Sequence, residues 1–179
     1  MEEEITILRL KSSLIECNKH IYKIVYDINE MRRFMPLSIE KYNNLSSEET
    51  TLIDSYILRF TKLQDRIGKL FQQILQENNI DTETMSFINI VNYMEKYHII
   101  DNVDEWHEIR KIRNNFTHEY PEDDKENVEQ LNESFFKAKN ILTIYCKTNA
   151  YVIENILKPY NVDIKDFQIK QDYIDELLL

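Results

Sequence analysis

The scarcity of glycine constrains the fold of this chain more than any other feature of its sequence. Only one glycine, Gly68, occurs among 179 residues, together with three prolines. Tight β-hairpins and phosphate-binding loops usually need glycine, because glycine adopts positive φ angles at little steric cost. The composition therefore argues against sheet-rich folds, P-loops and dinucleotide-binding turns. We expect an all-α protein whose helices are joined by short polar loops.

Apolar residues recur three or four positions apart along most of the chain, which is the spacing of amphipathic helices. Ser46 and Glu49 form a capping-box pattern at the start of one such segment. The other candidate N-caps are Asp81 or Thr82, Asp104, and Asp123 or Asp124. Pro36, Pro121 and Pro159 interrupt the helical pattern. The helices predicted in this way cover about residues 3–34, 47–78, 84–97, 104–119 and 123–157.

The length of the chain suits one domain with a substantial core and is short for two. We therefore predict a single antiparallel bundle of about five helices over residues 1–158. A C-terminal tail, predicted to be helical, follows over residues 159–179. Its apolar residues leave two possibilities open, packing against the core or contact with a partner. They include Ile164, Phe167, Ile174 and Leu177.

The formal net charge of −10 limits how the protein could bind nucleic acid. Proteins that bind RNA through its phosphates usually carry a basic surface, because Lys and Arg supply most of that affinity. An RNA site on this chain must therefore be a local basic patch. Otherwise, the acidic surface serves a protein partner.

Cysteine usage and hydropathy bear on the cellular compartment. Cys17 and Cys146 are isolated in the sequence, which favours reduced thiols in a cytoplasmic protein. The beginning of the chain lacks the pattern of a signal peptide, and no apolar run is long enough to predict a membrane span. His107 and His118 would lie about 16 Å apart along one helix, too far to share a metal ion, and we expect neither a metal nor a cofactor. His20 near Cys17 is more simply an incidental neighbour than half of a catalytic pair.

Charges are sorted by side on the helix predicted over residues 104–119. At about 100° per residue, one sector is apolar, and the sector beside it carries cations, histidines and amides without a carboxylate. The apolar sector contains Trp106, Ile109, Ile112, Phe116 and Tyr120. The cationic sector contains His107, Arg110, Lys111, Arg113, Asn114, Thr117 and His118. Two interpretations remain open, either ion pairs with acidic neighbouring helices or an anion-binding site.

The end of this helix carries the most specific motif of the chain. Residues 113–120 read Arg-Asn-Asn-Phe-Thr-His-Glu-Tyr, an arginine five positions before a histidine that is followed after one residue by a tyrosine. This segment resembles the RX4HXY signature of HepT-like toxins, a branch of the all-helical HEPN superfamily. The resemblance implies a metal-independent endoribonuclease that works as a homodimer, with the motif lining the cleft between the protomers. Arg113 and His118 are about 140° apart on a helix, so their side chains can converge only across a groove. Either a long arginine that reaches round the helix or a symmetric dimer with two copies of this helix side by side would allow that, and the geometry is compatible with both.

The motif supplies the groups that RNA cleavage without a metal requires. A base must deprotonate the ribose 2′-OH, an acid must protonate the departing 5′-oxygen, and a fixed positive charge must stabilise the phosphorane. His118 suits proton transfer at the negative end of a helix dipole, and Arg113 suits the fixed charge. Asn114 is a candidate to orient the imidazole or to bind the phosphate. Thr117 and Lys111 are weaker candidates at the rim.

A second segment supports the same family. Residues 54–65 place an aspartate before the pair Arg59-Phe60 and end in Asp65. This segment resembles the second helix of HepT-like proteins and of HEPN proteins associated with nucleotidyltransferases. Taken by itself, Arg59 is typical of a solvated or intrahelical charge, and Phe60 of a core residue. Together with the motif, Asp65 becomes a candidate acid that supports Arg113 or His118.

Tyr120 has two possible roles. Its position beside Phe116 and Trp106 favours a core or interface aromatic. The HepT resemblance implies instead that a cognate nucleotidyltransferase antitoxin attaches AMP to this tyrosine and silences the ribonuclease. A second functional class also stays open, a noncatalytic HEPN subunit that binds a nucleotide or a nucleotidyltransferase and regulates it. The net charge favours that class, whereas the intact motif favours the ribonuclease toxin.

Overall fold

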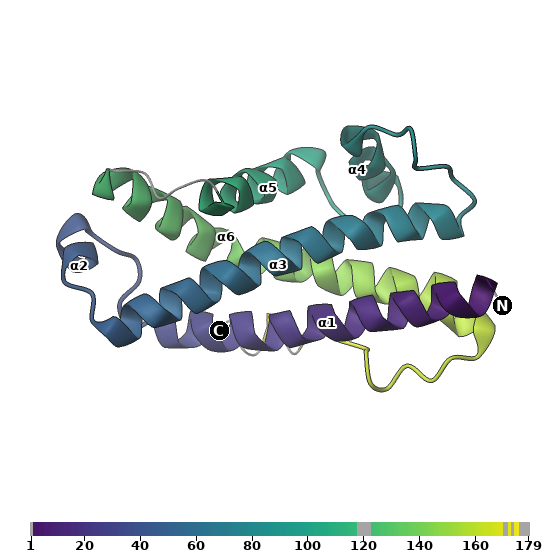
Figure 1. Cartoon of the computed structure of the whole chain (residues 1–179), viewed down its shortest axis with the longest axis horizontal. Helices are drawn as coiled ribbons and strands as arrows, with labels where there is room; N and C mark the ends of the chain where they lie inside the picture. The colour runs from purple at the N-terminus through teal and green to yellow at the C-terminus, as the bar shows by residue number, and fades with distance from the viewer. Residues whose placement is uncertain (1, 118–122, 170–171, 173, 176–179) are drawn as a thin grey trace.

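Three long helices run side by side along the molecule (Figure 1). They are α1 (Glu2–Met31), α3 (Ser47–Glu77) and α6 (Asp124–Tyr151). The computed structural model describes residues 2–117, 123–169, 172, 174 and 175. The shorter helices are α2 (Ile39–Asn43), α4 (Phe87–Lys96) and α5 (Val103–Thr117). No strand occurs in these described residues, which confirms the all-α helical bundle predicted from the sequence.

The core lies between the three long helices, and α5 packs against α3 and α6 (Figure 1). α1 and α3 run in opposite directions and make the most extensive pairing of the bundle. The apolar face predicted for α3 is the one that is buried, because its residues recur every three or four positions. Its fully buried members include Tyr56, Phe60, Leu63, Ile67, Leu70, Phe71 and Ile74.

Two of the long helices begin after the capping residues that the sequence predicts. α3 begins after the predicted capping box, in which Ser46 Oγ accepts from the Glu49 N–H at 3.2 Å and the Ser46 N–H donates to Glu49 Oε2 at 2.9 Å. α6 begins after Asp123, whose Oδ1 accepts from the Lys125 N–H at 2.9 Å. Both agree with the predicted caps.

Two other helix starts were predicted wrongly. α4 is capped by Ser86 rather than by Asp81 or Thr82, because Asp81 Oδ1 instead accepts from the Glu83 N–H at 2.9 Å in a local turn. Asp104 lies inside α5, and the Asn102 side chain accepts its N–H at 2.7 Å. The short helix α2, capped by Ser38, was not predicted.

The C-terminal segment folds back on the core. After α6 the chain continues through a π-helical turn (Val152–Leu157) and a 3-10 turn (Lys158–Tyr160), then reverses at Asn161, whose φ is 55°. Residues 161–169 form turns and irregular chain, whereas the described residues 172, 174 and 175 are helical, so the tail predicted to be helical is so only in part. Phe167 and Ile169 are nevertheless buried, at 4% and 6% exposed, and Val162 and Ile164 are partly buried against the core. Of the two possibilities left open for the tail, these residues take the first.

Hydropathy along the helices bears on membrane association. In the described part of the chain, no helix combines the length and the apolar character needed to span a bilayer.

Candidate functional site

α5 is held against the core by an apolar edge that the helical wheel predicted. Trp106, Ile109 and Ile112 are buried, and the Trp106 ring packs 4.8 Å from that of Phe71. Phe116 packs edge-on against Phe60 with ring centroids 6.2 Å apart. Because these contacts set the rotation of the helix, its cationic sector lies beside α3.

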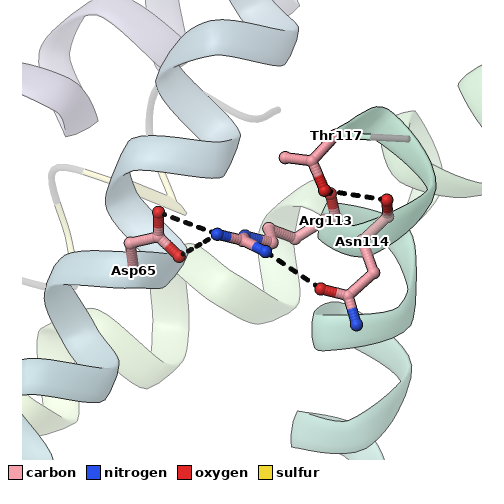
Figure 2. A network of polar contacts seen from close by, with 4 residues as sticks. All are labelled: Asp65, Arg113, Asn114 and Thr117. Carbon is pink, nitrogen blue, oxygen red and sulfur yellow. Dashed lines mark hydrogen bonds and ion pairs between the residues drawn. The ribbon is translucent and has the colours of Figure 1, made fainter. Parts of the chain in front are cut away.

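Arg113 is clamped between two side chains (Figure 2). Its Nη2 lies 2.9 Å from Asp65 Oδ1 and 3.2 Å from Asp65 Oδ2, across the gap between α5 and α3. Its Nη1 donates to Asn114 Oδ1 at 3.0 Å. A guanidinium carries five N–H donors, so donors remain after these bonds. The clamp therefore orients Arg113 and leaves it able to bind an anion.

The other residues predicted for the site differ in their contacts with Arg113. The Thr117 hydroxyl donates to the Asn114 carbonyl oxygen at 2.9 Å, a bond within the helix that occupies its proton (Figure 2). Lys111 is exposed and has no ion pair with any residue that the structure describes. His118 and Tyr120 lie outside the described residues, so their roles stay predictions. Asp65 is brought to Arg113, as the second segment predicted, although the contact alone assigns it no chemical role.

A hollow of about 280 Å³ opens beside Arg113, between α5, α3 and the start of α4. The Arg110 guanidinium lies 4.2 Å above the Phe87 ring at this hollow, so it stacks on an aromatic face instead of pairing with a carboxylate. The lining residues are Gln64, Asp65, Gly68, Lys69, Gln72, Phe87, Arg110, Arg113 and Asn114.

A second hollow of about 240 Å³ lies between α1 and α3 and shares Asp65 and Lys69 with the first. Its other lining residues are Glu16, His20, Leu58, Arg59, Lys62 and Arg66. The two hollows together present six cationic side chains and two carboxylates, Glu16 and Asp65. Each carboxylate pairs with an arginine, and Glu16 Oε2 lies 2.7 Å from Arg66 Nη2. A chain with a net charge of −10 thus carries one locally basic surface, which we call the basic track.

The part of the basic track that α3 supplies was not predicted from the sequence. The signal was present, because Arg59, Lys62, Arg66 and Lys69 recur at helical spacing. Their significance depends on α5 and α1 lying on either side of them, and spacing along one helix does not reveal that.

His20 is buried at the second hollow without a hydrogen bond. It is 6% exposed, and neither ring nitrogen has a hydrogen-bond partner among the described atoms. Its Nε2 lies 3.9 Å from Glu16 Oε1, beyond hydrogen-bond distance. Burial lowers the pKa of His20 below its ordinary value, and the positive charge of Arg59 lowers it further. The lowered pKa favours the neutral imidazole, although the Glu16 carboxylate acts in the opposite direction.

Cys17 offers no reactive thiolate beside this histidine. Burial raises the pKa of its thiol to about 12, and the nucleophilic form of cysteine is the thiolate. Across the described residues, no group of three or more His, Cys, Asp or Glu side chains is arranged to hold a metal ion.

Comparison with known proteins gives no relative from which a function can be transferred. No protein-family model, curated protein or solved structure matches the chain. The function must therefore be argued from the site itself.

Proposed function

We propose that this chain is a HEPN-like, metal-independent endoribonuclease that acts on RNA in the cytoplasm at a cleft between two copies of the chain. The observation that carries the proposal is the clamped Arg113 on the basic track, five positions before His118 in the motif.

The charge distribution supports an RNA substrate. The net charge of the chain disfavours nonspecific phosphate binding, so a phosphate site must be concentrated locally. The basic track meets that requirement, because its only carboxylates are already paired with Arg66 and Arg113. Arginine also binds phosphate with a planar fork of donors, which makes it a better clamp than a point charge.

The proposed reaction is a transesterification, in which the phosphoryl group passes from the 5′-oxygen to the ribose 2′-oxygen. His118 takes the proton from the 2′-OH, the 2′-oxygen attacks phosphorus, and the bond from phosphorus to the 5′-oxygen breaks. The leaving oxygen receives a proton, which the second copy of His118 in a dimeric cleft supplies. Arg113 neutralises the charge that accumulates on the phosphorane oxygens. The products are a 2′,3′-cyclic phosphate and a 5′-OH.

Cleavage of RNA in the presence of EDTA tests the proposal. The purified chain is expected to cut single-stranded RNA with excess EDTA, because none of the proposed steps uses a metal ion. Mapping of the product ends should find 2′,3′-cyclic phosphate, or 3′-phosphate after its hydrolysis. Intact RNA under these conditions, with a folded protein, would contradict the proposal.

The proposal includes a partner that controls the enzyme. A nucleotidyltransferase antitoxin attaches AMP to Tyr120, placing a bulky anion beside Arg113 and His118 and so excluding RNA by steric overlap and like charge. The chain purified after co-expression with a short nucleotidyltransferase from a neighbouring gene is expected to gain the mass of one AMP, whereas Tyr120→Phe is not. Modification of Tyr120→Phe to the same extent would rule out this tyrosine as the acceptor.

The alternative is a noncatalytic HEPN subunit that binds a nucleotide or a nucleotidyltransferase and regulates it. Its support is the net charge of −10, because an acidic surface suits a basic protein partner better than RNA. Growth of cells that express the chain separates the two. Growth arrest relieved by His118→Ala supports the toxin, whereas harmless expression of a folded chain supports the regulatory subunit.

A further inference from the structure

We propose that the hollow between α1 and α3 is a second phosphate site, which holds the backbone of single-stranded RNA away from the bond that is cut. This inference rests on the proposed ribonuclease function and adds the path that the substrate takes. The strand would cross α3 at Asp65 and Lys69, the residues common to both hollows.

Four cationic side chains form a stripe along α3. At about 100° per residue, Arg59, Lys62, Arg66 and Lys69 fall within a sector about 80° wide, and they span about 15 Å along the helix axis. Arg59, Lys62 and Lys69 have no ion pair with any residue in the described ranges. Arg66 pairs with Glu16, whereas the other three cations repel one another, so an anionic ligand between them would be stabilised.

His20 supplies an independent indication of a ligand. A buried polar group without a hydrogen bond is unfavourable and uncommon, yet both ring nitrogens of His20 are in this state. A neutral imidazole offers one N–H donor and one acceptor nitrogen. A phosphate oxygen in the hollow would accept from the N–H while Arg59 and Lys62 neutralise its charge. The Arg59 Nε, also buried and without a hydrogen-bond partner in the part of the chain that the structure describes, is a further donor at this hollow.

The arrangement of the two hollows suits a polymer. The hollows, of about 280 and 240 Å³, share Asp65 and Lys69 in their linings. A strand that contributes one or two nucleotides to each hollow would use both, with Arg113 at one end and His20 at the other.

Salt dependence of RNA binding tests the second phosphate site. The probe is a labelled single-stranded RNA oligonucleotide in EDTA, with His118→Ala in every protein so that the strand stays intact. For single strands, each lost phosphate contact reduces the slope of log K against log salt by about 0.7. We expect Arg59→Ala and Lys62→Ala each to lower the slope by about that amount, and the double variant by about twice as much. Lys158→Ala, in the turn after α6, is the matched control and should keep the parent slope.

His20→Phe provides a second variant that does not depend on removing a surface charge. It keeps a buried ring and removes two unpaired nitrogens, so the free protein should melt at the same or a higher temperature. RNA binding should nevertheless weaken. A lower melting temperature with unchanged RNA affinity would instead mean that the histidine stabilises the fold and binds no phosphate.

The outcomes distinguish this inference from the ribonuclease proposal. Wild-type cleavage combined with an unchanged salt slope in the double variant would overturn the second site alone. A lower slope in a protein that never cuts RNA would support the phosphate site and overturn the nuclease. The final measurement compares the thermal stability of the parent and of the double variant with and without inorganic phosphate, at constant ionic strength. If phosphate stabilises the parent but not the double variant while RNA affinity is the same in both, the hollow takes free phosphate and the RNA assignment fails.

Discussion

Arg113→Ala and His118→Ala are each expected to slow RNA cleavage in EDTA by about 100-fold or more. Proton transfer by a positioned side chain contributes about 10²–10⁴-fold, and removal of one preorganised charge or donor costs about 10²–10³-fold. The measurement is the initial rate of cleavage of a labelled RNA under single-turnover conditions. Wild-type rates in either variant would refute the role assigned to that residue.

The fold should survive the loss of Arg113. Its ion pair with Asp65 joins side chains that are 29% and 37% exposed, and such pairs contribute about 0–1 kcal/mol to stability. Chemical denaturation of Arg113→Ala should therefore show an unfolding free energy within about 1 kcal/mol of the wild type. A larger loss would mean that slow cleavage reports unfolding.

Two further variants identify what Arg113 contributes. Arg113→Lys keeps the charge and loses the planar fork, so it should cleave RNA more slowly than wild type and faster than Arg113→Ala. Arg33→Ala removes an arginine whose 3.8 Å pair with Glu30 lies far along the chain from the motif, and it should cleave at the wild-type rate. Equal activity of Arg113→Lys and wild type would show that charge alone is needed.

Asn149→Ala is expected to lower the free energy of unfolding by about 1–3 kcal/mol, the cost of one unsatisfied buried backbone group. Asn149 is fully buried and bonds the returning segment twice. Its Nδ2 donates to the Phe167 carbonyl at 2.8 Å, and its Oδ1 accepts from the Ile169 N–H at 3.0 Å. The Phe167 carbonyl also accepts from Asn18 Nδ2 at 3.0 Å and stays bonded in the variant. The Ile169 N–H loses the partner that the structure gives it.

Denaturant unfolding of Asn149→Ala measures this effect, with Asn155→Ala as the matched control. The Asn155 side chain is exposed and bonds only the Tyr151 carbonyl one turn back, so its loss should change stability by about 0.5 kcal/mol or less. Equal stability of the two variants would contradict the view that Asn149 fastens residues 161–169 to the core.

Local signals predicted much of the bundle. The recurrence of apolar residues identified the buried face of α3. On α5 it identified the buried residues Trp106, Ile109 and Ile112. The Ser46 capping box marked the start of α3 because both of its bonds form between residues three apart. Where several capping residues compete, as before α4, local sequence did not select Ser86. That choice depends on how Phe87 and the rest of α4 pack, which no short segment encodes.

The sequence by itself determined the helical class, because a chain with one glycine and regular apolar spacing has few alternatives. It also supplied the motif of Arg113 and His118. Only the tertiary structure decided what Arg113 meets, since Asp65 is 48 residues away and reaches it through the packing of α5 on α3. The packing of α1 on α3 joins the α3 cations to His20 and leaves that imidazole buried with no hydrogen-bond partner among the described residues. Spacing along one helix defines a face, whereas the contacts of that face depend on long-range burial of apolar surface.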